Sequence, residues 1–267
     1  MITSRQNPLI KQLRQLQRKK YRRQTGLYFI EGLRVVLTAI EQNAPIHTIV
    51  YAPDLLTSQP AFDMIAQAET NGLTCTPITA DLFRTISTRD NPRGLGAILH
   101  ANPTPLDQLT VHPHDIWVAL FEAANPGNIG TVLRTMDAMG AAGLLLIGQQ
   151  ATEPFQTDVA KASMGALFTL PVTTLPNWST AATWAQQQNL HLVATSAHAP
   201  HQFWQTDPSP YRYPALLLIG SERHGLPPAI QDSAHTAVTI PMHGHSTSLN
   251  AAVATALILY ELRRQAP

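Results

Sequence analysis

The segment Asn125-Pro126-Gly127-Asn128-Ile129-Gly130-Thr131-Val132-Leu133-Arg134 follows an apolar run and leads into a helical pattern. The apolar run, 117–121, predicts a buried strand that is followed by a glycine-containing loop. Gly127 and Gly130 would let the backbone approach a ligand closely. This strand, loop and helix decide the fold class, because ligands in open parallel sheets bind beyond the carboxyl ends of the strands.

Further apolar runs after this segment extend the pattern through the last part of the chain. We predict strands at 143–147, 190–194, 215–219 and 237–240, and helices at 130–139, 157–164, 180–188, 227–230 and 248–264. Strands that are apolar on both faces belong to a parallel sheet covered by helices on each side. Residues 114–267 are therefore predicted to form an α/β domain.

Two more loops resemble ligand-binding loops at strand ends. They are Ile219-Gly220-Ser221-Glu222-Arg223-His224-Gly225-Leu226 and Ile240-Pro241-Met242-His243-Gly244, which continues to Ser248-Leu249-Asn250. Considered alone, the second is a routine junction, and the third predicts Ser248 as the cap of the last helix, with Asn250 in its first turn. None of the three segments matches the phosphate-binding motif that ends in Gly-Lys-Ser/Thr or the dinucleotide-binding pattern Gly-x-Gly-x-x-Gly. A nucleotide triphosphatase and a dinucleotide-dependent oxidoreductase are both disfavoured.

Residues 1–101 predict a smaller α/β domain. Asn7-Pro8 is typical of a helix start, with Asn7 as the cap. Strands are expected at 27–30, 46–51, 74–78 and 96–99, and helices at 31–41, 62–69 and 81–86. The proline-rich stretch 102–113 is the expected linker.

The net charge of +1 conceals an asymmetry between the two parts of the chain. Residues 1–101 contain 12 Lys or Arg and 7 Asp or Glu, whereas 102–267 contain 6 and 10. A basic cluster attracts polyanions by releasing counterions, so RNA is the expected partner. The competing interpretations are a solvated helix face, although such faces usually mix signs, and a mitochondrial transit peptide. The candidate RNA-binding residues are Arg5, Lys11, Arg14, Arg18, Lys19, Lys20, Arg22 and Arg23.

Composition limits the remaining possibilities. The chain has one Cys, Cys75, and no apolar run approaching the roughly 18 residues of a membrane span, so we expect a cytoplasmic protein without membrane association. His198, His201, His243 and His245 lack the Cys or clustered carboxylates that would complete a metal site, and no metal is expected. The last helix is apolar nearly all round, which predicts either a core helix or a homodimer contact.

In their order and spacing, the three loops resemble the SpoU (TrmH-like) family of the SPOUT class of S-adenosylmethionine-dependent RNA methyltransferases, which modify the ribose 2′-hydroxyl. Asn128-x-Gly130-x-x-x-Arg134 matches the first motif, Gly220-x-Glu222-x-x-Gly225 the second, and Pro241-Met242 with Ser248-Leu249-Asn250 the third. Ser221, where Asn is frequent, and Ala251-Ala252 depart from the pattern. The N-terminal part resembles the L30e-like substrate-binding domain of this family, through Phe29-Ile30-Glu31-Gly32-Leu33-Arg34.

The resemblance implies a deep trefoil knot in the C-terminal domain and S-adenosylmethionine as cofactor. It implies that the cofactor site includes Gly220, Ser221, Ile240, Met242 and Leu249. The catalytic residues it implies are Asn128, Arg134, Glu222, Ser248 and Asn250. Arg134 would position the acceptor hydroxyl and its phosphate; whether it is also the general base stays open, because a guanidinium is protonated in nearly all proteins.

The expected reaction is methyl transfer to a ribose 2′-hydroxyl, with ribosomal RNA as the preferred substrate and transfer RNA as the alternative. A non-catalytic RNA-binding protein would keep the basic cluster but would not need Asn128, Glu222 and Asn250 together. A knotted methyltransferase that acts on a base nitrogen is a closer rival, but its motifs differ from the pattern between Asn128 and Arg134.

Overall fold

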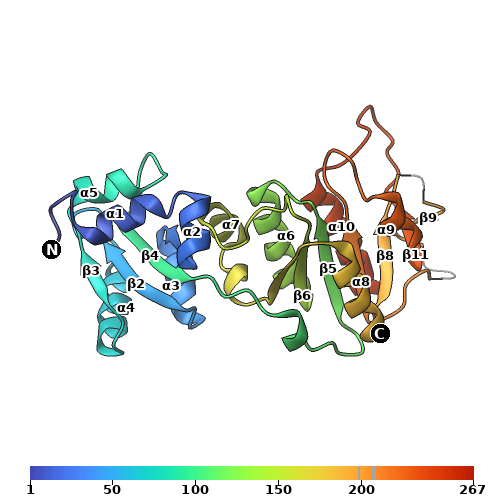
Figure 1. The fold of residues 1–267 in the computed structure, drawn as a ribbon, viewed down its shortest axis with the longest axis horizontal. Helices are drawn as coiled ribbons and strands as arrows, with labels where there is room; N and C mark the ends of the chain where they lie inside the picture. Colours follow the sequence, from blue (N-terminus) through green and yellow to red (C-terminus); the bar gives the residue numbers. More distant parts are fainter. Residues whose placement is uncertain (198, 206–208) are drawn as a thin grey trace. The chain divides into compact units, whose positions relative to one another are not determined.

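The computed structural model describes residues 1–197, 199–205 and 209–267, which form two compact units (Figure 1). The first contains Met1–Asn102 and Phe155–Phe168, and the second contains Pro103–Pro154 and Thr169–Pro267. His198, considered above as a metal ligand, lies outside the described residues. No helix in the described ranges has the length and apolar character needed to cross a bilayer.

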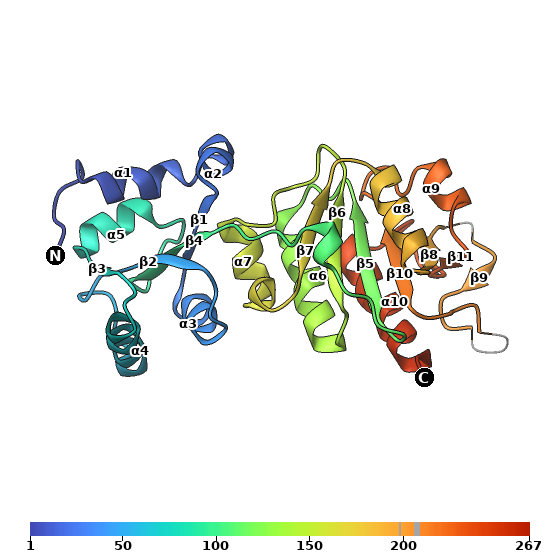
Figure 2. The same cartoon turned by 60° about the horizontal axis from the view of Figure 1, so that its bottom comes forward.

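The first unit is built on a four-stranded sheet in the order β1-β4-β2-β3, in which only the β2–β3 pair is parallel. Helices α1 and α5 cover one face, while α3 and α4 lie on the other (Figure 2). The strands are β1 Leu27–Glu31, β2 Ile46–Tyr51, β3 Cys75–Pro77 and β4 Leu95–His100. The helices are α1 Pro8–Gln15, α2 Lys19–Thr25, α3 Leu33–Glu41, α4 Gln59–Thr70 and α5 Ala80–Ile86.

The start of α1 matches its prediction, because Asn7 Oδ1 accepts a hydrogen bond from Leu9 N at 2.9 Å. Ile10 and Leu13 are fully buried against the sheet. The basic segment does not continue as one helix, since α1 ends and the separate helix α2 begins at Lys19. The predicted basic cluster is therefore distributed over two helices and the residues that precede each of them, Arg5 and Arg18.

The first unit also includes a later segment, Phe155–Phe168, which the sequence analysis assigned to the larger domain. This segment contains α7 (Thr157–Ser163) and the short helix η2 (Ala166–Phe168). Thr157 Oγ1 donates to Phe29 O of β1 at 2.7 Å, and the rings of Phe155 and Tyr28 lie 5.7 Å apart. Because β1 is an edge strand, α7 covers a boundary of the sheet that would otherwise be open.

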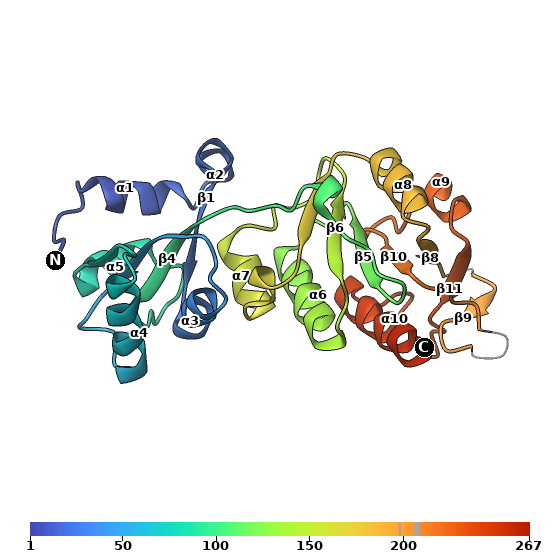
Figure 3. The same ribbon diagram turned by 90° about the horizontal axis from the view of Figure 1, so that it is seen from below.

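The second unit is a seven-stranded sheet in which every pair is parallel, in the order β7-β6-β5-β10-β8-β11-β9. Helices α6 and α10 lie on one face and α8 and α9 on the other (Figure 3). The predicted α/β parallel-sheet fold is confirmed. The strands are β5 Ile116–Phe121, β6 Gly143–Ile147, β7 Val172–Leu175, β8 His191–Thr195, β9 His201–Gln202, β10 Ala215–Ile219 and β11 Thr236–Thr239. The helices are α6 Pro126–Met139, α8 Trp178–Gln187, α9 Pro228–Asp232 and α10 Ala251–Gln265.

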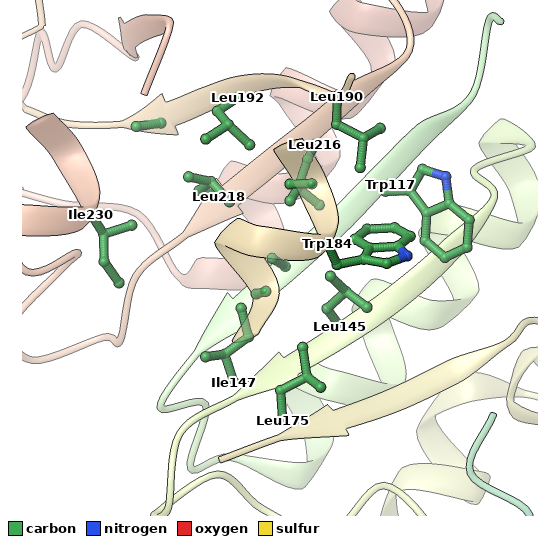
Figure 4. Packing of buried hydrophobic residues seen from close by; sticks show 14 of the residues in the cluster. Trp117, Leu145, Ile147, Leu175, Trp184, Leu190, Leu192, Leu216, Leu218 and Ile230 are labelled. Carbon is green, nitrogen blue, oxygen red and sulfur yellow. The ribbon is translucent and has the colours of Figure 1, made fainter. Parts of the chain in front are cut away.

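Beneath α8 lies a core in which Trp117 of β5 meets Trp184 of α8 edge to face, with ring centroids 5.3 Å apart (Figure 4). Leu145, Leu175 and Leu190 pack around the pair. Both indole N–H groups are buried without a hydrogen-bond acceptor in the described part of the chain. The core thus combines a large apolar area with two unpaired donors.

Two strands were missed by the sequence analysis, and both lie at the ends of the sheet. β7 carries Thr173 and exposed Thr174 between Val172 and Leu175, and β9 has only two residues, so neither forms a long apolar run. The expected linker is also partly ordered: it contains the helical turn η1 (Leu106–Gln108), and Thr104 O accepts a hydrogen bond from Thr173 Oγ1 at 2.7 Å.

The unpaired indole donor of Trp117 leads to a prediction about stability. Replacing Trp117 by Phe removes apolar area but also removes a buried N–H whose burial costs about 1 to 3 kcal/mol, so the net change should be within about 1 kcal/mol. Trp117→Ala removes the same N–H but loses far more packing, and should still cost about 3 to 5 kcal/mol. Urea unfolding compares both variants with the wild type, and a loss of several kcal/mol in Trp117→Phe would contradict an unpaired N–H.

A second prediction concerns His191 and His235, whose rings stack with centroids 5.1 Å apart. Burial, with a smaller effect from His235, lowers the pKa of His191 below its ordinary 6.5, and Arg212 acts in the same direction. The folded state therefore binds this proton less readily than the unfolded state, so its contribution to stability is present above pH 6.5 and is lost as pH falls. His191→Phe should show a smaller loss of unfolding free energy between pH 7.5 and 5.5 than the wild type.

Candidate active site

The three loops singled out in the sequence follow β5, β10 and β11. β5 and β10 are neighbours, and β8 separates β10 from β11. Because all these strands are parallel, their carboxyl ends lie at one edge of the sheet. We name the loops the first loop (residues 122–128), the second loop (220–227) and the third loop (240–250). Such an edge is where open α/β sheets bind ligands.

The first loop is shaped by a cap that the sequence analysis did not single out. Asn125 Oδ1 accepts hydrogen bonds from Gly127 N at 2.8 Å and Asn128 N at 3.3 Å, with Pro126 as the first helical residue. Asn-Pro is the same start signal that identified α1, so it could have been found. The cap places the Asn128 side chain in the first turn of α6.

A chain of amide hydrogen bonds joins the three loops. Asn250 Nδ2 donates to Asn128 Oδ1 at 3.0 Å, and Asn128 Nδ2 donates to Glu222 Oε1 at 2.7 Å. Asn250 Oδ1 accepts from Ala252 N at 2.9 Å and so caps α10. Since each amide has one acceptor and one donor group, the cap fixes the direction of every bond in the chain. The Glu222 carboxylate is thereby held by a charge-assisted hydrogen bond.

The second loop turns back on itself at close range. Ser221 and Gly225 exchange backbone hydrogen bonds, with Ser221 N to Gly225 O at 3.1 Å and Gly225 N to Ser221 O at 2.9 Å. A Cβ added to Gly220 would lie 2.1 Å from the carbonyl carbon of Gly225, and Gly225 itself has a φ of +65°. Only glycine satisfies both positions without strain. The pair of glycines therefore fixes the shape of this loop.

A cavity of about 700 Å³ lies between the second and third loops. Its floor includes residues from the ends of β8, β10 and β11, and the first turns of α10 close another side. The volume is in the range of sites for small molecules and cofactors. Of the predicted residues, the lining contains Gly220, Ser221, Glu222, Ile240, Met242, Ser248 and Leu249.

The remaining predicted site residues lie elsewhere, and one prediction is corrected. Asn128 and Asn250 form the amide chain beside the cavity, whereas exposed Arg134 lies further along α6 and is not among the lining residues. Ser248 does not cap the last helix: α10 begins at Ala251 with Asn250 as its cap. The cap moves two residues because Asn250 Oδ1 reaches the free N–H groups of the first turn.

The sequence analysis also missed the part of the cavity wall that follows β8. Thr195, Ser196 and Ala197 line the cavity together with Ala254 and Ile258 of α10. Their small or apolar side chains carry no motif that distinguishes them from core residues. The strand order alone predicts their place, because β8 lies between β10 and β11.

Two candidate RNA-binding arginines have internal partners. Arg14 Nη2 donates to Thr85 Oγ1 at 2.9 Å, and Arg22 Nη1 donates to the carbonyls of Leu16 and Gln17 at 3.0 Å each. These bonds connect α1 to α5 and α2 to the end of α1. The other candidates are exposed: Arg5, Lys11, Arg18, Lys19, Lys20 and Arg23.

Comparison with solved structures gives the same fold over nearly the whole chain. An AdoMet-bound rRNA methyltransferase from Sinorhizobium meliloti is 32% identical with a TM-score of 0.89, covering 98% of this chain and 97% of that one. The SpoU methyltransferase AviRb from Streptomyces viridochromogenes, in complex with AdoMet, is 29% identical with a TM-score of 0.85, covering 97% and 98%.

Sequence comparisons also find similarity to rRNA methyltransferases. A 23S rRNA (uridine(2479)-2′-O)-methyltransferase of Streptomyces viridochromogenes is 30% identical over 250 residues, 91% of this chain and 85% of that protein. Residues 7–97 match the MRM3-like substrate binding domain, and residues 115–260 match the SpoU rRNA Methylase family. The family resemblance drawn from the three loops is confirmed, and the chain belongs to the SpoU rRNA methylase family.

Proposed function

We propose that this protein transfers a methyl group from S-adenosylmethionine to a ribose 2′-hydroxyl of ribosomal RNA. The observation that carries the proposal is the chain from Asn250 through Asn128 to Glu222, which joins all three family motifs beside one cavity. A protein that only binds RNA would not need these three residues together. The relatives described above as rRNA methyltransferases support the same reaction and substrate.

The cavity suits S-adenosylmethionine. Ile219, Val238, Ile240 and Leu249 offer apolar surface for the adenine, while the backbone groups of the second and third loops offer hydrogen bonds. Close approach of the backbone is possible at Gly220, where a side chain could not fit. When bound, the cofactor supplies an already activated methyl group on a sulfonium, so the protein chiefly has to place the acceptor and manage its proton.

Asn128 of the first loop and Arg134 of α6 act on the acceptor. Asn128 is held from both sides by Asn250 and Glu222, so little reorganisation is needed when a ribose arrives. Arg134 holds the phosphate and orients the hydroxyl through its planar guanidinium. The hydroxyl proton passes to solvent water as the hydroxyl oxygen accepts the methyl group. We keep Arg134 as a positioning group, because an arginine seldom gives up its own proton.

The location of Arg134 outside the cavity lining supports a homodimer, in which Arg134 of the partner subunit completes the site. Val253, Leu257 and Tyr260 are 48%, 40% and 56% exposed and recur at helical spacing along α10. An exposed apolar stripe of this kind is suited to an intersubunit contact. Dimerisation would also bring the positive charge of Arg134 to a cavity whose own lining includes Glu222.

The first unit is proposed to select and bind the RNA. Its match to a substrate binding domain and its exposed basic residues on α1 and α2 favour this role. Action on ribosomal RNA would place the protein in the cytoplasm in bacteria such as those of its relatives. The trefoil knot implied by the family resemblance stays a prediction for the C-terminal domain.

The reaction is tested with radiolabelled S-adenosylmethionine and unmodified ribosomal or transfer RNA. Alkaline cleavage requires a free 2′-hydroxyl, so label in alkali-resistant dinucleotides from ribosomal RNA is the expected result. Label in resistant dinucleotides from transfer RNA alone would identify transfer RNA as the substrate instead. Label only in mononucleotides would identify base methylation instead, and the absence of label together with failure to bind S-adenosylmethionine would favour a non-catalytic RNA-binding protein.

Arg134→Ala tests the positioning role. We expect at least a 100-fold loss of methyl transfer, because the acceptor would lose its charged positioning group. The affinity for S-adenosylmethionine, measured by calorimetry, should stay within about twofold, since Arg134 does not line the cavity. A large loss of cofactor affinity would contradict this assignment. Thr135→Ala, on the next residue of α6, is the matched control.

Asn250→Asp separates capping from orientation. Aspartate caps a helix as well as asparagine, so the free energy of unfolding should change by less than about 0.5 kcal/mol. It has no N–H to donate to Asn128, and it adds a negative charge near Glu222, so methyl transfer should fall at least tenfold. Asn250→Ala should lose both properties and cost about 1 kcal/mol of stability. Wild-type activity in Asn250→Asp would show that the amide chain is dispensable.

A further inference from the structure

Trp204 is the only exposed tryptophan of the four, all of which the structure describes, and its side chain is 44% exposed. It follows β9, the last strand of the sheet, which runs parallel to β11. Trp204 therefore comes after the carboxyl end of its strand, as the three motif loops do. The exposed indole of Trp204 takes no part in the amide chain and does not line the cavity.

Hydrogen bonds hold the backbone of the turn that carries Trp204, whereas the Trp204 side chain is exposed. Gln205 N donates to Gln202 O at 3.0 Å and closes a β-turn with Phe203 and Trp204 at its centre. The carbonyl of Gln205 accepts from Gln265 Nε2 at 3.0 Å, and Tyr211 Oη donates to the carbonyl of Phe203. The ring of Phe203 supports the indole edge to face at 4.9 Å. The fixed backbone thus presents an aromatic side chain in a defined place.

This turn is continuous with the cofactor cavity. Phe203 N donates to the carbonyl of Thr239 at 3.0 Å, and Thr239 lines the cavity immediately before the third loop. Trp204 itself is not among the lining residues, so a cofactor in the cavity would leave the indole uncovered. Arg223 of the second loop lines the cavity and is exposed, which provides a positive charge on the same side of the sheet.

We propose that Trp204 stacks on an unpaired base of the RNA substrate, a few nucleotides away from the nucleotide that is methylated. This rests on the proposed function, because the occupant is RNA. Four strand spacings of about 4.8 Å separate β9 from β5, so the indole is roughly 19 Å across the sheet edge from the first loop. A short single-stranded segment can span that distance. Stacking on aromatic rings is the common way in which proteins hold unpaired bases.

Steady-state kinetics with ribosomal RNA test the proposal in the full-length protein. Trp204→Ala should raise the KM for RNA about tenfold or more and leave kcat at saturating RNA within about twofold. Trp204→Phe keeps an aromatic face and should recover most of the affinity, whereas Trp204→Leu, which is apolar but not aromatic, should not. Equal behaviour of Phe and Leu would overturn stacking. The melting temperature of each variant controls for misfolding.

Intrinsic fluorescence gives a reading that does not depend on activity. Poly(A), which has unpaired bases, should quench the emission of the wild type but not of Trp204→Phe, and the poly(A)·poly(U) duplex should quench it little. Quenching that persists in Trp204→Phe would assign it to another tryptophan and overturn the proposal. A tenfold change in S-adenosylmethionine affinity in Trp204→Ala would assign the indole to the cofactor, and dissociation of a dimer would assign it to a subunit contact.

If the wild type transfers no methyl group to ribosomal RNA, the proposed function fails while the quenching experiment still decides whether Trp204 stacks. If transfer occurs and Trp204→Ala keeps the wild-type KM for RNA, only the stacking inference fails. The two proposals can therefore be rejected separately.

Discussion

The direction of the amide group of Asn250 sets the arrangement of the site. Its oxygen is committed to the first turn of α10, where Ala252 N and Val253 N would otherwise lack acceptors. Its nitrogen must then point to Asn128 Oδ1, and Asn128 in turn must present its nitrogen to Glu222. A helix cap at the C-terminal end of the fold thus determines the orientation of a side chain 122 residues earlier. The geometry of the candidate site and the stability of α10 are linked through one side chain.

Backbone shape is equally important for the cavity beside these residues. Gly220 and Gly225 let the second loop fold onto itself within a distance that no Cβ at Gly220 could tolerate. The loop is then closed by two backbone hydrogen bonds between Ser221 and Gly225, so its form does not depend on long side chains. A cavity built from backbone and small residues fits a ligand that carries its own reactive group, since the protein needs to bind and orient it more than to activate it.

The sequence predicted what repeated apolar runs and helix caps encode. β6 and β10 were located to the residue because both of their faces are buried, whereas β7 has exposed Thr174 and lies near the edge of the sheet. The three loops were found because glycine and proline mark strand ends. The partners of those loops were not predictable, because hydrogen bonds between Asn128, Glu222 and Asn250 depend on strand order. The docking of α7 on β1 was likewise hidden, since Thr157 and Phe29 are 128 residues apart.

Charge alone does not explain how the larger unit would hold RNA. Residues 102–267 carry more acidic than basic residues, and some of those basic groups are committed: Arg263 bonds to the carbonyls of Met139 and Gly140, and Arg264 to Glu261. Arg134 on α6 and Arg223 in the second loop are exposed. With so few cations, nonspecific attraction there is weak, and long-range attraction falls to the basic helices α1 and α2. Under the proposed function, binding near the reacting ribose would then depend on shape and stacking, which require a fixed, exposed ring more than a positive patch.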